Sequence, residues 1–181
     1  MTRLKALNPE QAEGKTKNLF DSIQSKMGLV PNMMRTMGNS PALLEGTLLL
    51  SNAMGNGLLG AKTAELIALA VAESNGCKYC LGAHTFVGAS VFKMDAKTLN
   101  EARKGNGADT KTDAILKFAK ALVNKQGQVN DADVHSIKSA GVSEAEICEV
   151  IGHVALNILT NYFNTTALTE PDFPEVEAVA V

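Results

Sequence analysis

The sequence has no tryptophan, and aromatic residues make up only 4% of its 181 residues. Alanine, leucine, methionine and glycine are common instead, and such small or flexible side chains favour close packing between helices over a sheet core. No stretch shows the alternation of polar and apolar residues that a half-buried strand requires. The composition and the patterning therefore predict an all-α fold.

The sequence also lacks long apolar runs, a surplus of positive charge and a set of paired cysteines. No apolar run approaches 18 residues, and the N-terminal segment has no apolar core, so we expect neither a transmembrane helix nor a signal peptide. The net charge of −2 gives no electrostatic reason for binding nucleic acid or an anionic membrane. Three cysteines, too few for a disulfide framework, indicate a soluble protein of the reducing cytoplasm.

Capping residues and hydrophobic periodicity divide the chain into successive helices. The chain is long enough for a substantial core, and we expect one all-α domain over residues 1–181, with its core at about 30–168. A helical extension would occupy residues 1–29 and an irregular tail residues 169–181. Helices are expected to begin at Asn8-Pro9, Pro31, Ser40-Pro41, Gly60, Cys77, Asp95, Thr110, Asp131 and the capping box formed by Ser143 and Glu146.

The segment ESNGCKYCLGAH gathers two of the three cysteines and one of the three histidines within eight positions. If Cys77 lies in the first turn of a helix, the spacing places Cys77, Cys80 and His84 on one face. Residues three apart on a helix have Cβ atoms about 5–6 Å apart, so the two sulfur atoms can form a disulfide with modest adjustment. His84, one turn further on, can accept or hold the thiol proton.

The position of this motif favours an ionised sulfur. The N-terminus of a helix carries unpaired N–H groups and a partial positive charge, both of which favour thiolate over thiol. Glu65 lies near the beginning of an otherwise apolar helix, where burying a lone carboxylate is costly. The antiparallel return after Asn75-Gly76 would place this carboxylate near the imidazole of His84, where it would orient the ring and favour its protonated form.

Glu65, eleven intervening residues, Cys77-Lys78-Tyr79-Cys80 and then His84 form a pattern that resembles the alkylhydroperoxidase D core of the carboxymuconolactone decarboxylase-like superfamily. The similarity extends over about Val30 to Phe92, and the segment HVALNILTNYFN is similar to the peroxidase-related branch. The resemblance implies an all-helical fold that associates as trimers or hexamers. It also implies an antioxidant peroxidase whose thiol pair cycles through a disulfide.

The resemblance assigns a role to each residue of the motif. Cys80 would attack the hydroperoxide, Cys77 would resolve the sulfenic acid to a disulfide, His84 would carry the proton, and Glu65 would be its partner. A dithiol reductant, in the type enzyme a lipoyl-bearing protein, would restore the thiols, and neither a bound cofactor nor a metal is expected. The sequence departs from the best-studied members at Tyr79, where they carry a histidine; a phenol is a poor base at neutral pH.

Other interpretations remain open. The two cysteines and His84 could bind zinc, with Cys148, His153 or Glu65 as the fourth ligand, in a redox or zinc-binding module without catalytic activity. A lyase like the carboxymuconolactone decarboxylases is the alternative enzyme, although its chemistry does not need a thiol pair.

Several further residues are assigned to packing or to the surface. Cys148 is expected in the core, His153 in the core or beside the site, and His135 on the surface. The methionines at positions 33, 34, 37 and 54 are expected to pack the core or a subunit contact, or else to line an entry for an apolar peroxide. The apolar stretch LLEGTLLLSNAMGNGLL exceeds what one small bundle buries, which predicts a homo-oligomer.

Overall fold

The computed structural model describes residues 2–177 and 179, and within these residues all regular secondary structure is helical. The predicted all-α fold is therefore confirmed. The helices are α1 (Gly14–Met27), α2 (Asn32–Met37), α3 (Pro41–Gly55), α4 (Gly60–Ser74), α5 (Lys78–Ser90), α6 (Ala96–Lys104), α7 (Thr110–Asn124), α8 (Asp131–Ser139) and α9 (Glu144–Ala167).

Side-chain caps explain where most of these helices begin. The hydroxyl of Ser40 accepts from the backbone N–H of Leu43 at the start of α3, and Asp95 caps α6 through Thr98. Ser143 and Glu146 form the predicted capping box of α9. Each cap satisfies backbone N–H groups that would otherwise have no partner at the end of a helix.

The first helix begins later than predicted, at Gly14 instead of Asn8. The Asn8 side chain does accept a backbone N–H, that of Glu10, but the bond closes only a local turn. Residues 2–13 form no helix, and Leu7 and Ala12 within them pack against the cluster formed by α1 to α3. The prediction was wrong because an Asx turn and an N-cap use the same side-chain bond.

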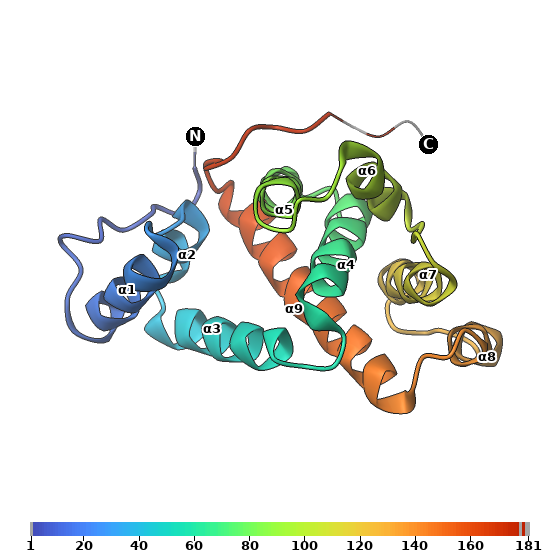
Figure 1. Ribbon diagram of the computed structural model, residues 1–181. Helices are drawn as coiled ribbons and strands as arrows, with labels where there is room; N and C mark the ends of the chain where they lie inside the picture. Colours follow the sequence, from blue (N-terminus) through green and yellow to red (C-terminus); the bar gives the residue numbers. More distant parts are fainter. Residues whose placement is uncertain (1, 178, 180–181) are drawn as a thin grey trace.

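Helix α4 lies at the centre of the larger part of the molecule and packs against α5, α6, α7 and α9 (Figure 1). Six consecutive residues in the second half of α4, residues 67–72, are buried on all sides of the helix. They share a hydrophobic core with α7 and α9, to which Leu116 and Val150 contribute fully buried side chains. The packing around α4 holds its neighbour α5, which carries the two cysteines, in a fixed position.

Helices α1, α2 and α3 form a second hydrophobic cluster beside the first. Phe20, Ile23, Met37 and Leu44 are its buried residues together with Val30, and Phe163 of α9 packs against them. Figure 1 shows α9 running diagonally between the two groups of helices. Because α9 contacts both α3 and α5, it helps to place the second cluster relative to α5.

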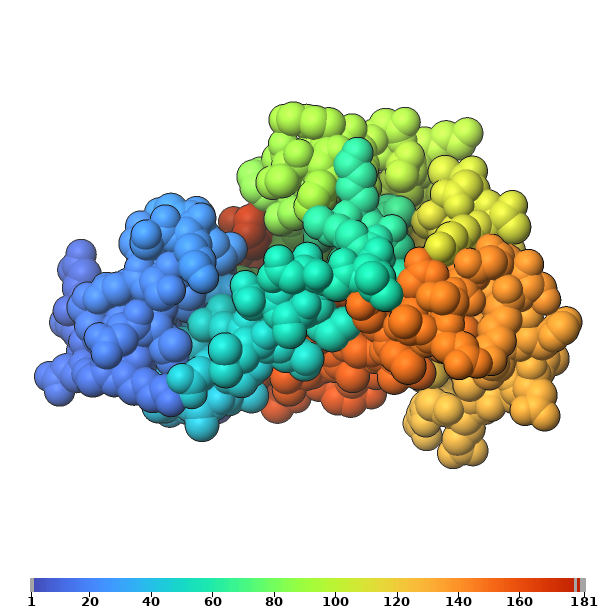
Figure 2. All heavy atoms as spheres, turned by 60° about the horizontal axis from the view of Figure 1, so that its bottom comes forward, coloured from blue at the N-terminus to red at the C-terminus, as the bar shows by residue number. Residues whose placement is uncertain are grey.

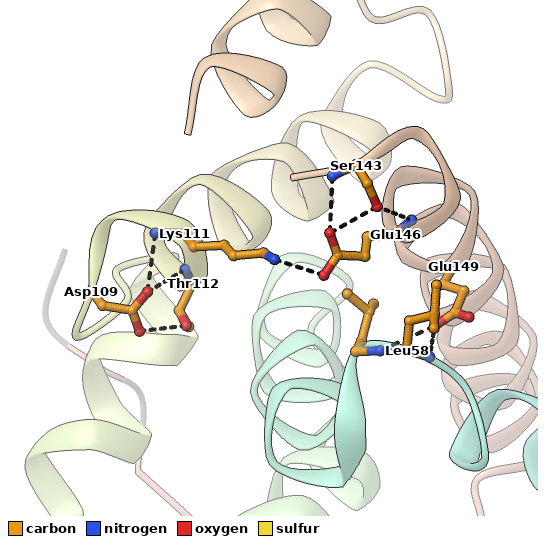
Figure 3. Close-up of polar contacts among 8 residues, drawn as sticks. Leu58, Asp109, Lys111, Thr112, Ser143, Glu146 and Glu149 are labelled. Atoms are coloured by element: carbon orange, nitrogen blue, oxygen red, sulfur yellow. Dashed lines mark hydrogen bonds and ion pairs between the residues drawn. The ribbon is translucent and has the colours of Figure 1, made fainter. Parts of the chain in front are cut away.

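At its N-terminal end, α9 is tied to neighbouring elements by an ion pair and by hydrogen bonds (Figure 3). Lys111 of α7 lies 2.7 Å from the carboxylate of Glu146, and this ion pair, with the backbone N–H of Ser143, lowers the pKa of Glu146 to about 2. One turn later, Glu149 accepts the backbone N–H groups of Leu58 at 2.7 Å and Leu59 at 3.1 Å. The loop between α3 and α4 is thereby anchored on α9.

The chain after α9 runs as an irregular tail across α5 towards α6 (Figure 1). A Cβ atom on Gly82 of α5 would lie 2.8 Å from the backbone oxygen of Pro174, so only glycine allows this close approach. Further along, the buried side chain of Arg103 pairs with Glu73 at 2.7 Å and donates to the backbone oxygen of Glu177 at 2.8 Å. The tail is thus held on the bundle at several points.

The apolar stretch from α3 to α4 leaves large side chains exposed on the surface of the single chain. Leu49 and Leu58 are each 65% exposed. Figure 2 shows the face on which α3 lies against α9. Within residues 2–177 and 179, no helix combines the length and the hydropathy needed to cross a membrane.

Candidate active site

Cys77 and Cys80 lie together at the start of α5. Cys77 is the N-cap residue, and its sulfur accepts the backbone N–H of Cys80 at 3.4 Å. The two Sγ atoms are 2.9 Å apart, and both cysteines are free and buried. A disulfide has an S–S length of about 2.05 Å, so oxidation requires only a small approach of the two atoms.

The hydrogen bond between the two sulfur atoms makes the thiols titrate unequally. The hydrogen bond with Cys80 lowers the pKa of Cys77 to about 7 despite its burial, and the backbone N–H of Cys80, Thr165 and the charge of His84 act in the same direction. The pKa of Cys80 is raised by its hydrogen bond to Cys77, by burial and by the charge of Cys77. The first proton leaves the pair easily, and the second is held.

His84 and Glu65 form a hydrogen-bonded pair between α5 and α4. The Nδ1 atom of His84 lies 2.8 Å from Oε1 of Glu65. The side chain of Glu65 is 12% exposed and that of His84 is 28% exposed. Because Nδ1 is bound to the carboxylate, Nε2 is the ring nitrogen that remains for proton transfer.

Cys80, Glu65 and His84 line one cavity of about 250 Å³. The remaining wall is mostly apolar and comes from α1, α2, α3, α5, α9 and the tail. Its largest side chains are Met27, Met33, Met34, Leu48, Val87, Leu156 and Phe173. Two of the methionines that were expected to pack the core thus line the cavity as well, and the cavity suits a small, largely apolar molecule.

Cys77 lines a different cavity, of about 290 Å³, between α5, the last turns of α9 and the tail. Asn164 and Thr165 of α9 form one side of it, and Pro171 and Glu175 of the tail form another. The two sulfur atoms, although in contact, therefore border two separate spaces.

Tyr79, between the two cysteines, fastens the tail. Its hydroxyl donates to Asp172 at 2.5 Å and accepts the backbone N–H of Met33 at 3.3 Å. Asp172 also accepts the backbone N–H of Asn32 at 2.9 Å, and Phe173 packs edge-on against the ring of Tyr79. Burial and the bond to Asp172 raise the pKa of Tyr79, so this residue cannot act as the base that a histidine supplies.

The other predicted candidates lie away from this site. Cys148 is exposed, contrary to the expectation of a core cysteine, because its position on α9 faces solvent between the buried Ile147 and Val150. His153 is 4% exposed and its pKa is lowered by burial, which makes it a core residue. His135 is exposed, as predicted. Among the residues that the structure describes, no three His, Cys, Asp or Glu side chains are placed to bind a metal ion.

Sequence reasoning missed three residues that contact the motif: Asn161, Asn164 and Asp172. Asn164 donates from Nδ2 to the sulfur of Cys80 at 3.3 Å. A signal for the asparagines was present, because residues 157, 161 and 164 repeat a polar amide at helical spacing along an otherwise apolar helix. No local pattern indicated Asp172.

Comparisons with known proteins point to the same part of the chain. The model of the carboxymuconolactone decarboxylase family matches residues 41–90, the segment from the start of α3 to the end of α5 that carries Glu65, both cysteines and His84. No curated protein sequence matches the chain significantly.

Several solved structures share the fold over nearly the whole chain. An uncharacterized peroxidase-related protein from Silicibacter sp. TM1040 is 24% identical, with a TM-score of 0.78 and 95% of each chain covered. An uncharacterized peroxidase-related protein with an alkylhydroperoxidase AhpD core, from Ralstonia eutropha JMP134, is 20% identical, with a TM-score of 0.83, covering 94% of this chain and 92% of that one. The debrominase Bmp8 is 18% identical, with a TM-score of 0.79 and coverage of 95% and 93%.

The family match and the shared fold together confirm the predicted resemblance to the alkylhydroperoxidase D-like and carboxymuconolactone decarboxylase-like superfamily. The predicted AhpD-like bundle, with a CxxC motif at the beginning of α5, is confirmed with it.

Proposed function

We propose that this protein is a thiol-dependent peroxidase that reduces hydroperoxides through a dithiol–disulfide cycle. The observation that carries the proposal is the contact of Cys77 and Cys80 at 2.9 Å, beside a Glu65–His84 pair that lines the same cavity as Cys80. A nucleophile, a partner that traps its oxidised form, and an oriented proton carrier are the groups that such a reaction needs.

The cycle begins when the thiolate of Cys80 attacks the terminal oxygen of the hydroperoxide. An S–O bond forms and the O–O bond breaks, leaving a sulfenic acid on Cys80, and the departing alkoxide takes a proton from His84. Cys77 then attacks the sulfur of Cys80, the S–O bond breaks, and water leaves with the proton of Cys77. The two electrons come from the dithiol, which a thiol reductant must restore by exchange.

Cys80 is the proposed attacking residue because it borders the cavity of Glu65 and His84. The resting charge favours Cys77, whose pKa is the lower of the two. These observations are compatible, because a proton shared over 2.9 Å can move to Cys77 as Cys80 attacks. Free thiols are maintained in a reducing compartment, so the proposed location is the cytoplasm. The exposed apolar side chains of α3 support the proposed homo-oligomer, a trimer or hexamer.

A second candidate is the reductive removal of a halogen from a small aromatic molecule. It is suggested by the fold shared with Bmp8, of which one crystal structure contains 2,3,4-tribromopyrrole. The same dithiol would supply the two electrons: the carbon–halogen bond would break, a thiol proton would take the place of the halogen on carbon, and the products would be halide and the Cys77–Cys80 disulfide. Neither the lyase nor the zinc-binding alternative has a specific feature of the site in its favour.

The test counts free thiols in denatured samples before and after a few equivalents of cumene hydroperoxide, using a Cys148→Ser variant so that only the pair is counted. The peroxidase loses both thiols per chain, and dithiothreitol restores them. Thiols that survive the peroxide but are oxidised by a bromopyrrole would favour dehalogenation. Thiols inert to both would contradict each thiol-based proposal and leave the lyase.

A further inference from the structure

Three asparagines are buried along the side of α9 that faces the middle of the molecule. Asn157 is 6% exposed, Asn161 is 0% exposed and Asn164 is 3% exposed. An amide buried without hydrogen bonds costs free energy, so the groups that each of these amides contacts show what the position requires.

The amide of Asn164 directs its donor end at sulfur. Its Nδ2 atom lies 3.3 Å from Sγ of Cys80 and 3.1 Å from Sδ of Met33, while its Oδ1 atom is buried without a partner. The opposite orientation of the amide would place its oxygen against the thioether sulfur of Met33, which has no hydrogen to donate. The side chain of Asn164 therefore donates an N–H group to Cys80, and its Oδ1 atom accepts no hydrogen bond.

The side-chain amide of Asn161, one turn earlier on α9, is held by a hydrogen bond to its oxygen. Its Oδ1 atom accepts from Nδ2 of Asn75, the residue that ends α4, at 2.9 Å. This bond fixes the amide and leaves Nδ2 of Asn161 buried without a partner. The pKa of Cys80 is raised by Cys77 and by burial, while the hydrogen bond from Asn164 and the nearby amide of Asn161 act in the opposite direction.

We propose that Asn161 and Asn164 form a pair of amide donors that stabilises negative charge on the sulfur of Cys80. The pair would act when Cys80 attacks the substrate and again when reduction of the disulfide releases Cys80 as a thiolate. A hydrogen bond to a charged group is stronger than one to its neutral form, so the donors favour thiolate over thiol. This inference rests on the proposed function only in taking hydroperoxide reduction as the reaction that Cys80 performs.

The donor pair explains how Cys80 can be the attacking sulfur in a pair whose resting charge favours Cys77. The other titratable groups beside Cys80 come from α5 with its N-cap and from α4: Cys77 contacts its sulfur, Tyr79 is electrostatically coupled to it, and His84 and Glu65 line the same cavity. On α9 the polar groups nearest Cys80 are neutral amides, which supply donors without an added charge.

The experiment measures the ionisation of Cys80 in a background of Cys77→Ser and Cys148→Ser, where proton sharing and surface alkylation are both removed. The rate of alkylation of Cys80 by iodoacetamide is followed against pH by mass spectrometry of the peptide. Asn164→Leu is the main variant. Because the Oδ1 atom of Asn164 accepts no hydrogen bond, its removal leaves no donor without a partner. We expect the pKa of Cys80 to rise by about one unit, a roughly tenfold loss of thiolate below that pKa.

A second variant keeps the inference testable if leucine disturbs packing. Asn161→Asp retains an acceptor for Asn75 but replaces the unpaired N–H with a carboxylate, so the pKa of Cys80 should rise further than in Asn164→Leu. Asn124→Leu, at the exposed end of α7, is the matched control and should leave the pH profile unchanged. The inference is overturned if the pH profiles of Asn164→Leu and Asn161→Asp both coincide with the profile of the Cys77→Ser, Cys148→Ser background.

The outcome is independent of peroxide chemistry, since alkylation needs only the thiolate. If the predicted shifts appear in a protein whose dithiol does not react with hydroperoxide, the amide pair stands and the proposed peroxidase is wrong. If hydroperoxide oxidises the pair but the asparagine variants show no shift, the peroxidase stands and the inference about the amides is wrong.

Discussion

The two sulfur atoms of the CxxC motif touch each other but differ in their surroundings. Cys80 borders an apolar cavity that it shares with Glu65 and His84, and Asn164 of α9 donates a hydrogen bond to its sulfur. Cys77 caps α5 and borders a separate space beneath the tail. The proposed cycle accordingly gives the two thiols unequal tasks: Cys80 would react with the hydroperoxide, which needs a proton, and Cys77 would exchange with the reducing thiol.

The tail accounts for much of this difference. Asp172 joins it to Tyr79 of α5 and to the first N–H of α2, and Pro171 and Glu175 complete the wall beside Cys77. Cys77 is consequently only 1% exposed. A reductant that approaches Cys77 must enter beneath the tail or displace it.

The largest effect should come from removing one sulfur at a time. Cys80→Ser should abolish hydroperoxide consumption, because the remaining thiol lacks the cavity of Glu65 and His84. Cys77→Ser should consume one equivalent per chain and then stop, because no partner resolves the sulfenic acid. Single-turnover assays with cumene hydroperoxide measure both.

The matched pair of variants also tests the assignment of roles. Equal behaviour of the two serine variants in a single turnover would contradict the division of labour between the sulfur atoms. A burst of hydroperoxide consumption in Cys80→Ser, with none in Cys77→Ser, would reverse the roles assigned to the two cysteines.

A smaller effect is expected from Glu65→Gln. Glutamine keeps the shape of the side chain but no longer fixes the imidazole as a carboxylate does, so alkylation of Cys80 near neutral pH should slow by about tenfold. Glu45→Gln, which breaks an exposed ion pair between α3 and α1, is the control and should alkylate at the wild-type rate. An unchanged rate in Glu65→Gln would reduce Glu65 to a structural residue.

The smallest effect should follow from Asp172→Ala, which releases the tail from Tyr79. Loss of these hydrogen bonds should open the space beside Cys77 and speed reduction of the disulfide by a monothiol about threefold to tenfold. The hydroperoxide step at Cys80 should change less, and comparison of the two rates in stopped flow measures the difference. Equal changes in both rates would mean that the tail does not separate the two sides.

Much of the fold followed from local chemistry. Ser40, Asp95 and the box of Ser143 with Glu146 predicted the beginnings of their helices because a cap acts on N–H groups within the same turn. The start of α1 was missed because Asn8 makes the same kind of bond in a turn that no helix continues. The exposure of Cys148 was missed because neighbouring positions on a helix lie on different faces, and only packing decides which face is buried.

The sequence by itself determined the motif: its spacing places Cys77, Cys80 and His84 along one helix, and the reversal at Asn75-Gly76 returns that helix beside Glu65. These relations span few residues, so helical geometry governs them. The tertiary structure alone decided which sulfur borders which cavity. The amide of Asn164 and the carboxylate of Asp172 lie 84 and 93 residues along the chain from their partners Cys80 and Tyr79, where only packing can bring them together.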